Sequence, residues 1–336
     1  MKGRLPLEQN RALAHAIVPS MAYDGKESFA AWQKKARAKL EALMGLPFTR
    51  CEDKLDIEYQ KQMDGFTEIR FTFQSEESYF VPAVLWIPDG AQKPLPTVIC
   101  LQGHSTGMHI SLGRPVYPKD VESINGGDRD FCVRALAEGY CTIALEQRCF
   151  GECGGTEKGP DCGQSSLNAL LIGRTTIGER VWDIQRLIDV LEAHFSEWAD
   201  CSALICMGNS GGGTATFYAA CVEERICYVM PSCAVCEYDD SILAVPHCTC
   251  NYIPQIRQFF EMGDLTGLLA PRPFVLVSGV DDPIFPKHGV RKSFDKAQAL
   301  YAAAGAPENC KLVVGQGAHR FYADEAWPVM NAFVRG

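Results

Sequence analysis

The sequence lacks any long apolar run, any block of basic residues and any internal repeat. A helix that crosses a bilayer needs about 20 consecutive apolar residues, and no stretch of this chain approaches that length. Residues 1–17 are broken by proline and charged side chains instead of forming the apolar core of a secretory signal. We therefore expect a cytoplasmic protein without a membrane partner.

Acidic residues outnumber basic ones, so the 336 residues carry a formal net charge of −9. A partner that carries phosphates must be met by clustered Lys and Arg, so nucleic acid is not expected as a partner. With 47% hydrophobic and 22% charged residues, the composition is that of a globular protein with a large core. The composition is also compatible with a homo-oligomer.

The pattern of apolar residues changes twice along the chain. A helix is expected over residues 26–44, within an N-terminal extension of residues 1–50, and short extended segments over 55–87 predict antiparallel strands. Apolar runs then alternate with helical segments, which predicts an α/β fold with a mostly parallel sheet covered by helices on both faces. The expected later strands are 97–101, 141–145, the segment before residue 210, 226–230, 274–278 and 311–314, and the expected helices are 128–138, 178–195, 212–221 and 290–304.

We expect one domain over residues 1–336, since single α/β domains often exceed 200 residues. Residues 232–269 are long for a connection, and such segments are usually lids or insertions with a function. In a sheet of this kind the ligand site lies at the carboxyl ends of the strands.

Residues 208–212 read Gly-Asn-Ser-Gly-Gly and follow an apolar strand, which matches the G-x-S-x-G pattern of a nucleophile elbow. A serine on a sharp strand-to-helix turn needs neighbours without side chains where the two backbones approach, and Gly208 and Gly212 supply that room. The pattern alone also fits a glycine-rich turn. Its position after a buried strand favours Ser210 as the nucleophile.

A serine nucleophile needs a histidine base that is held by a carboxylate. In the order nucleophile, acid, base that accompanies such elbows, the base is His288 or His319. His288 begins an expected helix and fits a surface residue, whereas His319 lies in a glycine-rich loop after the last strand and is our choice. Asp281 and Asp282 follow the preceding strand and offer the acid, and the outside candidates are Glu237, Asp239 and Asp240.

Attack on an ester carbonyl creates an oxyanion that needs N–H donors in place beforehand. The backbone of Gly211, directly after the nucleophile, would supply one donor. The second is expected from the loop after the first core strand, at the backbone of His104 or Ser105. Residues that could line a substrate pocket are Gln102, Gly103, Tyr238, His247 and Tyr252.

Sixteen cysteines are spread over the expected strands and helices, in a chain too long to need a disulfide framework. We expect most of them to be reduced and buried. One cluster allows a zinc site by its spacing, although packing is the preferred reading because the second half lacks the usual gap between ligands. Its members are Cys233, Cys236, His247, Cys248 and Cys250.

Together these residues resemble the α/β-hydrolase superfamily, and more narrowly its acetyl xylan esterase-like branch, which is related to dienelactone hydrolases and prolyl-oligopeptidase-type catalytic domains. The likeness runs from about residue 28 to the end. Asp282 lies in a Gly-x-x-Asp-x-x-x-Pro frame similar to the acid loops of these enzymes, which favours it over Asp281. Residues 146–152 resemble a D-x-R-G-x-G-x-S segment of the branch, with Glu146 and Cys149 in place of the usual Asp and Gly.

The resemblance implies a serine esterase without cofactor or catalytic metal, acting on a small-molecule or oligosaccharide ester such as an acetylated sugar. Glucuronoyl esterases carry Arg where this chain has Gly212, and dienelactone hydrolases carry Cys where it has Ser210. Two alternatives remain open. One is a serine peptidase, although too few residues precede the core sheet for a propeller domain, and the other is a noncatalytic binding protein on a hydrolase fold.

Overall fold

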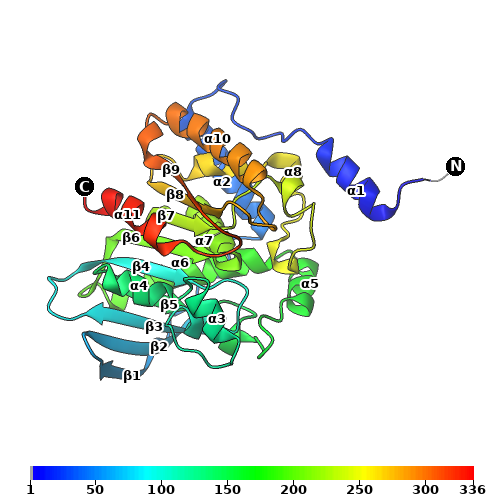
Figure 1. The fold of residues 1–336 in the computed structure, drawn as a ribbon. Helices are drawn as coiled ribbons and strands as arrows, with labels where there is room; N and C mark the ends of the chain where they lie inside the picture. Colours follow the sequence, from blue (N-terminus) through cyan, green and yellow to red (C-terminus); the bar gives the residue numbers. More distant parts are fainter. Residues whose placement is uncertain (1–2) are drawn as a thin grey trace.

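A mixed nine-stranded sheet forms the centre of the protein in the computed structural model, which describes residues 3–336 (Figure 1). The strand order is β1-β2-β3-β5-β4-β6-β7-β8-β9. The strands are β1 Asp56–Gln62, β2 Phe66–Glu76, β3 Tyr79–Pro88, β4 Leu95–Leu101, β5 Cys141–Leu145, β6 Ala199–Asn209, β7 Ile226–Ser232, β8 Phe274–Gly279 and β9 Cys310–Gly315.

The first three strands are antiparallel, and β3 also pairs antiparallel with β5. From β5 to β9 all neighbours are parallel. Parallel neighbours place their carboxyl ends at one edge of the sheet, so the loops after β4, β6, β8 and β9 meet there. The predicted parallel sheet with antiparallel opening strands is confirmed.

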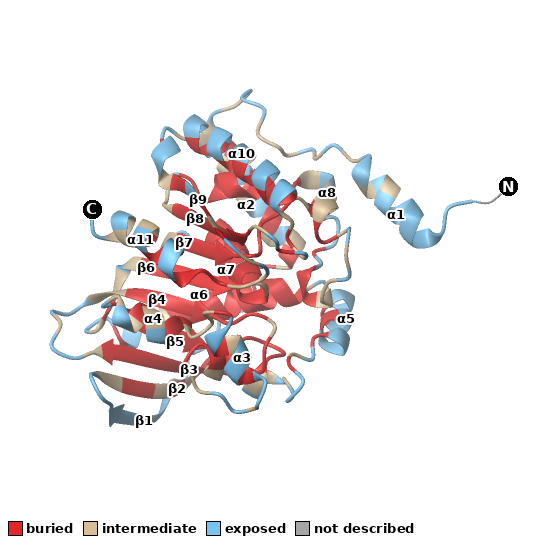
Figure 2. Ribbon diagram, in the orientation of Figure 1, coloured by how far each residue is buried: buried red, intermediate tan, exposed pale blue. Residues whose placement is uncertain are grey.

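Helices cover both faces of the sheet, and the inner helices and the strands other than the exposed edge strand β1 are largely buried (Figure 2). One face carries α2, α6, α7 and α10, and the other carries α4 and α11. The helices are α1 Pro6–His15, α2 Phe29–Met44, α3 Asp120–Asn125, α4 Phe131–Ala137, α5 Gly163–Leu171, α6 Thr176–His194, α7 Gly211–Val222, α8 Ile256–Phe259, α9 Met262–Leu265, α10 Lys287–Ala303 and α11 Ala323–Val334.

Several helices were not predicted, and each has a physical reason. Helix α11 contains Pro328, which interrupts the usual helical pattern, yet Trp327 and Met330 pack it on the sheet. Helices α3, α8 and α9 have only six, four and four residues, too few to show a period of 3.6. The apolar residues Leu167 and Leu171 of α5 are exposed, so this helix shows no inward-facing apolar pattern.

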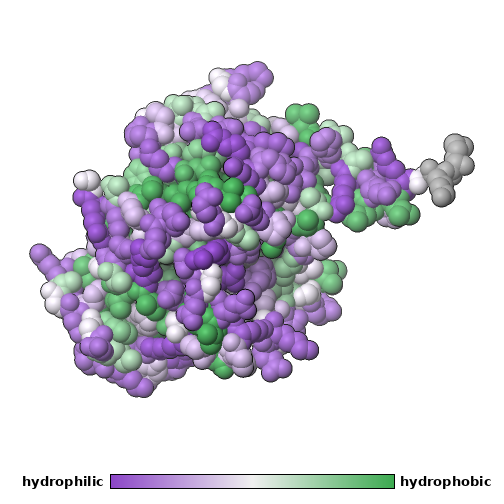
Figure 3. Space-filling view, viewed as in Figure 1, coloured by the Kyte–Doolittle hydropathy of each residue, from purple (hydrophilic) through white to green (hydrophobic). Residues whose placement is uncertain are grey.

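Helix α1 projects from the body of the molecule and buries none of its residues (Figure 3). Two polar contacts connect it to residues 232–269: Arg11 donates to the Ala244 carbonyl at 2.9 Å, and His15 Nδ1 lies 2.9 Å from Asp239 Oδ2. Among residues 3–336, no helix has the length and apolar character that a bilayer crossing requires.

Candidate active site

Ser210 lies on the turn between β6 and α7, with φ 56° and ψ −122°. A non-glycine residue rarely adopts a positive φ, and this conformation is the strained turn expected of a nucleophile elbow. The turn is tight because the end of β4 lies against it. A Cβ on Gly208 would lie 2.5 Å from the Leu101 carbonyl oxygen, and a Cβ on Gly212 would overlap the same oxygen.

His319 and Asp282 form a hydrogen-bonded pair at the same edge of the sheet, since His319 Nδ1 lies 2.9 Å from Asp282 Oδ2. The other carboxylate oxygen of Asp282 accepts backbone N–H groups of Ile284 at 2.8 Å and Phe285 at 3.0 Å. Burial raises the pKa of Asp282, but the hydrogen bond and charge of His319 and these N–H groups outweigh it and hold that pKa below its usual value. Asp282 can therefore orient the imidazole of His319.

Asp281 does not share this position. Asp281 is exposed, and its backbone N–H donates a hydrogen bond to the Gly317 carbonyl at 2.9 Å. His288 lies in the first turn of α10, 3.2 Å from Asp240, with most of its side chain exposed. The structure thus brings Asp282, and neither Asp281 nor His288, to the base that the sequence favoured.

A cavity of about 320 Å³ opens beside Ser210. Phe285 forms part of its wall and stacks on the His319 ring with 5.9 Å between ring centroids, so His319 lies next to the cavity wall. Its lining residues are His104, Ser210, Gly211, Thr214, Pro246, His247, Cys248, Asn251, Ile284 and Phe285. This volume is at the small end of the range for small-molecule sites.

The loop after β4 lies directly against Ser210. A Cβ on Gly103 would lie 3.2 Å from the Ser210 Cβ, and a Cβ on Gly211 would lie 2.6 Å from His104 Nδ1. Gly211 is the first residue of α7, where backbone N–H groups have no partner within the helix. His104 and Gly211 therefore lie beside Ser210 at this cavity, and the backbone N–H of Gly211 with that of His104 or Ser105 stays the predicted pair of oxyanion donors.

Glu146, the residue directly after β5, holds this loop in place by hydrogen bonds. It is buried and accepts hydrogen bonds from the Gln102 side chain at 2.8 Å and from the backbone N–H of Met108 at 3.1 Å. Burial raises the pKa of Glu146 to about 8, against the effect of its backbone hydrogen bonds. The departure from Asp to Glu in this segment thus provides a carboxyl long enough to hold both ends of the loop.

We expect Glu146→Gln to change how stability depends on pH. The folded pKa lies above the unfolded value of about 4.5, so the contribution of Glu146 to the free energy of unfolding is complete below about pH 4.5 and is lost as the pH rises through about 8. The thermal midpoint of the wild type should therefore fall relative to that of Glu146→Gln between about pH 5 and pH 9. Exposed Glu122 gives the control variant Glu122→Gln, and parallel wild-type and Glu146→Gln profiles would contradict the prediction.

The predicted substrate-lining residues separate into two groups. His247 lines the cavity, and Gly103 lies beside Ser210. Gln102 is buried against Glu146 instead, while Tyr238 and Tyr252 line another cavity of about 220 Å³ between residues 232–269 and Ile17. The structure does not bring these last three to the Ser210 cavity: Gln102 pairs with Glu146, the Tyr238 hydroxyl pairs with that of Tyr218, and Tyr252 is exposed.

The cysteine cluster suggested by spacing does not form. Cys233 lies beside Asp282 and His319, Cys236 faces the Pro286 carbonyl, and His247 lies 3.2 Å from the Ser241 hydroxyl. Cys248 and Cys250 turn to different partners, His104 and Cys162. All sixteen cysteines are free thiols.

Sequence reasoning missed Thr214, Phe285, Cys233 and Cys162 as neighbours of the site. The sequence could have predicted that Phe285 lies near the site, because Phe285 comes three residues after Asp282 in the same loop. The position of Cys162 depends on the path of a long loop before α5, for which the sequence carries no periodic signal.

Comparison with known proteins identifies the family of this chain. The model of the Abhydrolase family matches residues 8–209, more than half of the chain. "Putative hydrolase YtaP" of Bacillus subtilis (strain 168) is 26% identical over 247 residues, which are 71% of this chain and 77% of that protein.

Solved structures share the fold at low identity. A "putative acetyl xylan esterase" from Bacteroides fragilis NCTC 9343 has a TM-score of 0.78 at 20% identity, over 93% of this chain and 83% of that chain. A glucuronoyl esterase from Solibacter usitatus has a TM-score of 0.72 at 14% identity, over 95% of this chain and 97% of that chain. As the resemblance predicted, the chain belongs to the Abhydrolase family and has the α/β-hydrolase fold.

Proposed function

We propose that the protein is a serine-dependent carboxylic ester hydrolase. His319 accepts the proton of the Ser210 hydroxyl as Ser210 Oγ attacks the ester carbonyl, and the imidazolium returns that proton to the departing alcohol. Water, activated by the same base, then releases the acid from the acyl-enzyme. The N–H of Gly211 and an N–H of His104 or Ser105 stabilise the oxyanion in both steps.

One observation carries this proposal: the Asp282–His319 pair lies on the loops after β8 and β9, at the sheet edge that holds Ser210 on its positive-φ turn. Asp282 is buried and also accepts two backbone N–H groups, so it is fixed in position. The arrangement follows the logic of a serine triad.

The cavity supports a small acyl group as the part of the substrate next to Ser210. Its volume of about 320 Å³ leaves little room for a long chain, and Pro246, Ile284 and Phe285 give it an apolar side. A carbohydrate ester is the substrate class we propose, because the structural neighbours of the same fold are an acetyl xylan esterase and glucuronoyl esterases.

An activity screen of the purified full chain tests the proposal. The panel contains acetylated sugars, methyl esters, aryl acyl esters of increasing chain length and small peptides. We expect turnover of acetyl and other short acyl esters, with a sharp decline as the acyl chain grows. Cleavage of peptides without cleavage of esters would contradict the proposal and favour a peptidase.

Asp282→Asn is expected to reduce kcat for an aryl acetate by about 10²- to 10⁴-fold, because an amide cannot hold the imidazole in the required tautomer or stabilise its positive charge. Asp281→Asn is the matched control one residue away and should keep activity within about twofold, since Asp281 is exposed and makes no contact with His319. Steady-state kinetics of both variants decide the assignment. Similar losses in both would refute it.

A further inference from the structure

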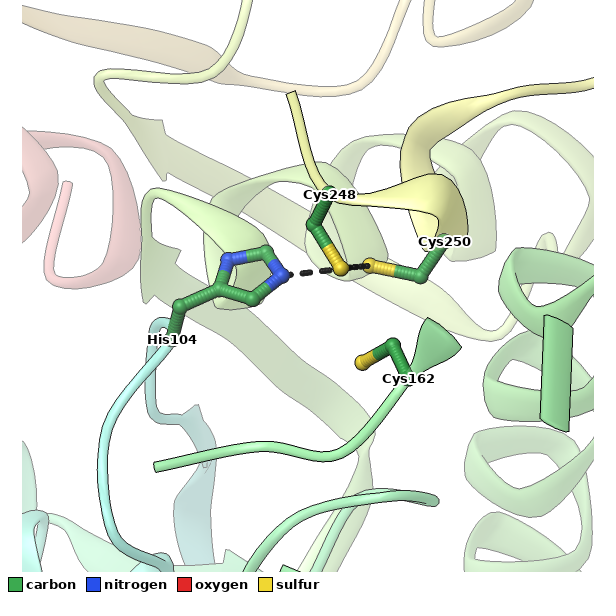
Figure 4. A group of neighbouring side chains, drawn as sticks. All are labelled: His104, Cys162, Cys248 and Cys250. Atoms are coloured by element: carbon green, nitrogen blue, oxygen red, sulfur yellow. Dashed lines mark hydrogen bonds between the residues drawn. The ribbon is translucent and has the colours of Figure 1, made fainter. Parts of the chain in front are cut away.

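Four potential metal ligands converge next to Ser210, outside the triad (Figure 4). His104 comes from the loop after β4, and Cys162 directly precedes α5. Cys248 precedes, and Cys250 lies within, the short 3₁₀ helix Thr249–Asn251. His104 Nε2 lies 3.1 Å from Cys250 Sγ, and Cys250 Sγ lies 3.2 Å from Cys248 Sγ. All four ligand atoms lie within 4.8 Å of one another.

The distances match the requirements of a tetrahedral Cys₃His site. A Zn–S bond of about 2.3 Å places two sulfur ligands about 3.8 Å apart across a tetrahedron. The Cys248 and Cys250 sulfur atoms lie 3.2 Å apart and no two ligand atoms of the cluster are more than 4.8 Å apart, so the cluster has the dimensions of such a site. Three thiolates and one imidazole are a ligand set that zinc prefers in structural sites.

Arg180 provides a second observation that points to an ion. Its side chain is fully buried, with Nη1 3.4 Å from Cys250 Sγ and Nη2 3.3 Å from Cys162 Sγ. Within residues 3–336, no carboxylate forms an ion pair with Arg180, although a buried guanidinium needs a negative partner. A zinc ion with three thiolates and a neutral imidazole carries one net negative charge, which Arg180 would balance.

We propose that His104, Cys162, Cys248 and Cys250 bind one Zn²⁺ ion in a structural site. Four protein ligands close the coordination shell, which distinguishes a structural site from a catalytic zinc that keeps a position open for water. The ion would fasten residues 232–269 to the loop that carries the backbone of His104. Its effect on the oxyanion site rests on the proposed function, whereas binding of the ion does not.

Metal content of the full-length protein, with any affinity tag removed, tests the proposal directly. After purification with a reductant and dialysis against excess Zn²⁺ and then buffer, we expect about one zinc ion per chain by mass spectrometry of the elements. Co²⁺ in place of Zn²⁺ should give the absorption bands of tetrahedral thiolate coordination. Ser210→Ala should bind zinc as the wild type does, so failure of the metal site and failure of the esterase proposal are distinguishable.

Two cysteine variants locate the site. Cys248→Ser, at a partly exposed position that tolerates the change, should weaken zinc binding at least about tenfold in competition with a chromophoric chelator. Cys236→Ser should bind as the wild type does, because Cys236 belongs to the spacing-based cluster but faces Pro286. Circular dichroism confirms that both are folded.

Three results would overturn the proposal. The first is a folded wild type that holds less than about one-tenth of a zinc ion per chain. The second is equal loss of zinc in Cys236→Ser and Cys248→Ser. The third is a disulfide between Cys248 and Cys250 in protein kept under reductant, since it would consume two of the four ligands.

Discussion

Ser210→Ala is expected to reduce kcat/KM for aryl acetates by at least about 10³-fold, the scale on which loss of a serine nucleophile acts in triad enzymes. The hydroxyl is the only nucleophilic side chain on the elbow, since Gly208, Gly211 and Gly212 have no side chains and Asn209 carries an amide. The φ of 56° at Ser210 is the strained backbone conformation that a nucleophile elbow requires. Initial rates at several substrate concentrations give the measurement.

Ser202→Ala is the matched control, because Ser202 is exposed near the start of β6, the strand that leads to Ser210. This variant should retain full activity. A fluorophosphonate probe should label the wild type and Ser202→Ala but not Ser210→Ala, with the labelled peptide containing residue 210. Wild-type rates in folded Ser210→Ala would end the assignment of a serine mechanism.

The sequence predicted the features that are local. An apolar strand followed by Gly-x-Ser-x-Gly determines both the conformation at Ser210 and the start of α7, and alternation of strands and helices determines the parallel part of the sheet. Sheet topology then brings Asp282 and His319 to the edge that holds Ser210, although they are 72 and 109 residues further along the chain. Residue order left two candidates for the base and two for the acid, and the glycine-rich loop after the last strand and the Gly-x-x-Asp-x-x-x-Pro frame favoured His319 and Asp282 among them.

Features that depend on the path of loops were not predictable in the same way. The partners of Cys248 and Cys250 are His104 and Cys162, which are 144 and 86 residues from Cys248 and belong to no shared pattern. Spacing instead linked them to Cys233 and Cys236, which point to other surroundings. Tyr238 was misplaced for the same reason, because its hydroxyl pairs with that of Tyr218 at 2.6 Å inside the core.

Gly212→Ala is expected to lower the free energy of unfolding by at least about 3 kcal/mol or to prevent folding. A Cβ at this position would overlap the carbonyl oxygen of Leu101 and lie 2.6 Å from that of Gln102. Both atoms belong to the backbone at the end of β4, so no side-chain rotation can relieve the clash. Either β4 or α7 must move, and both lie in the centre of the sheet and its helical cover.

Gly163→Ala gives the control for this prediction. Gly163 begins α5, its surroundings are open, and alanine favours a helix over glycine, so stability should stay unchanged or rise by up to about 1 kcal/mol. Urea unfolding followed by circular dichroism measures both variants. If Gly212→Ala unfolded at the wild-type urea concentration, β4 and α7 would not be in contact at the elbow. The backbone of His104, two residues after Gln102, would then lose its place beside Ser210, and the oxyanion site proposed at that loop would have to be abandoned.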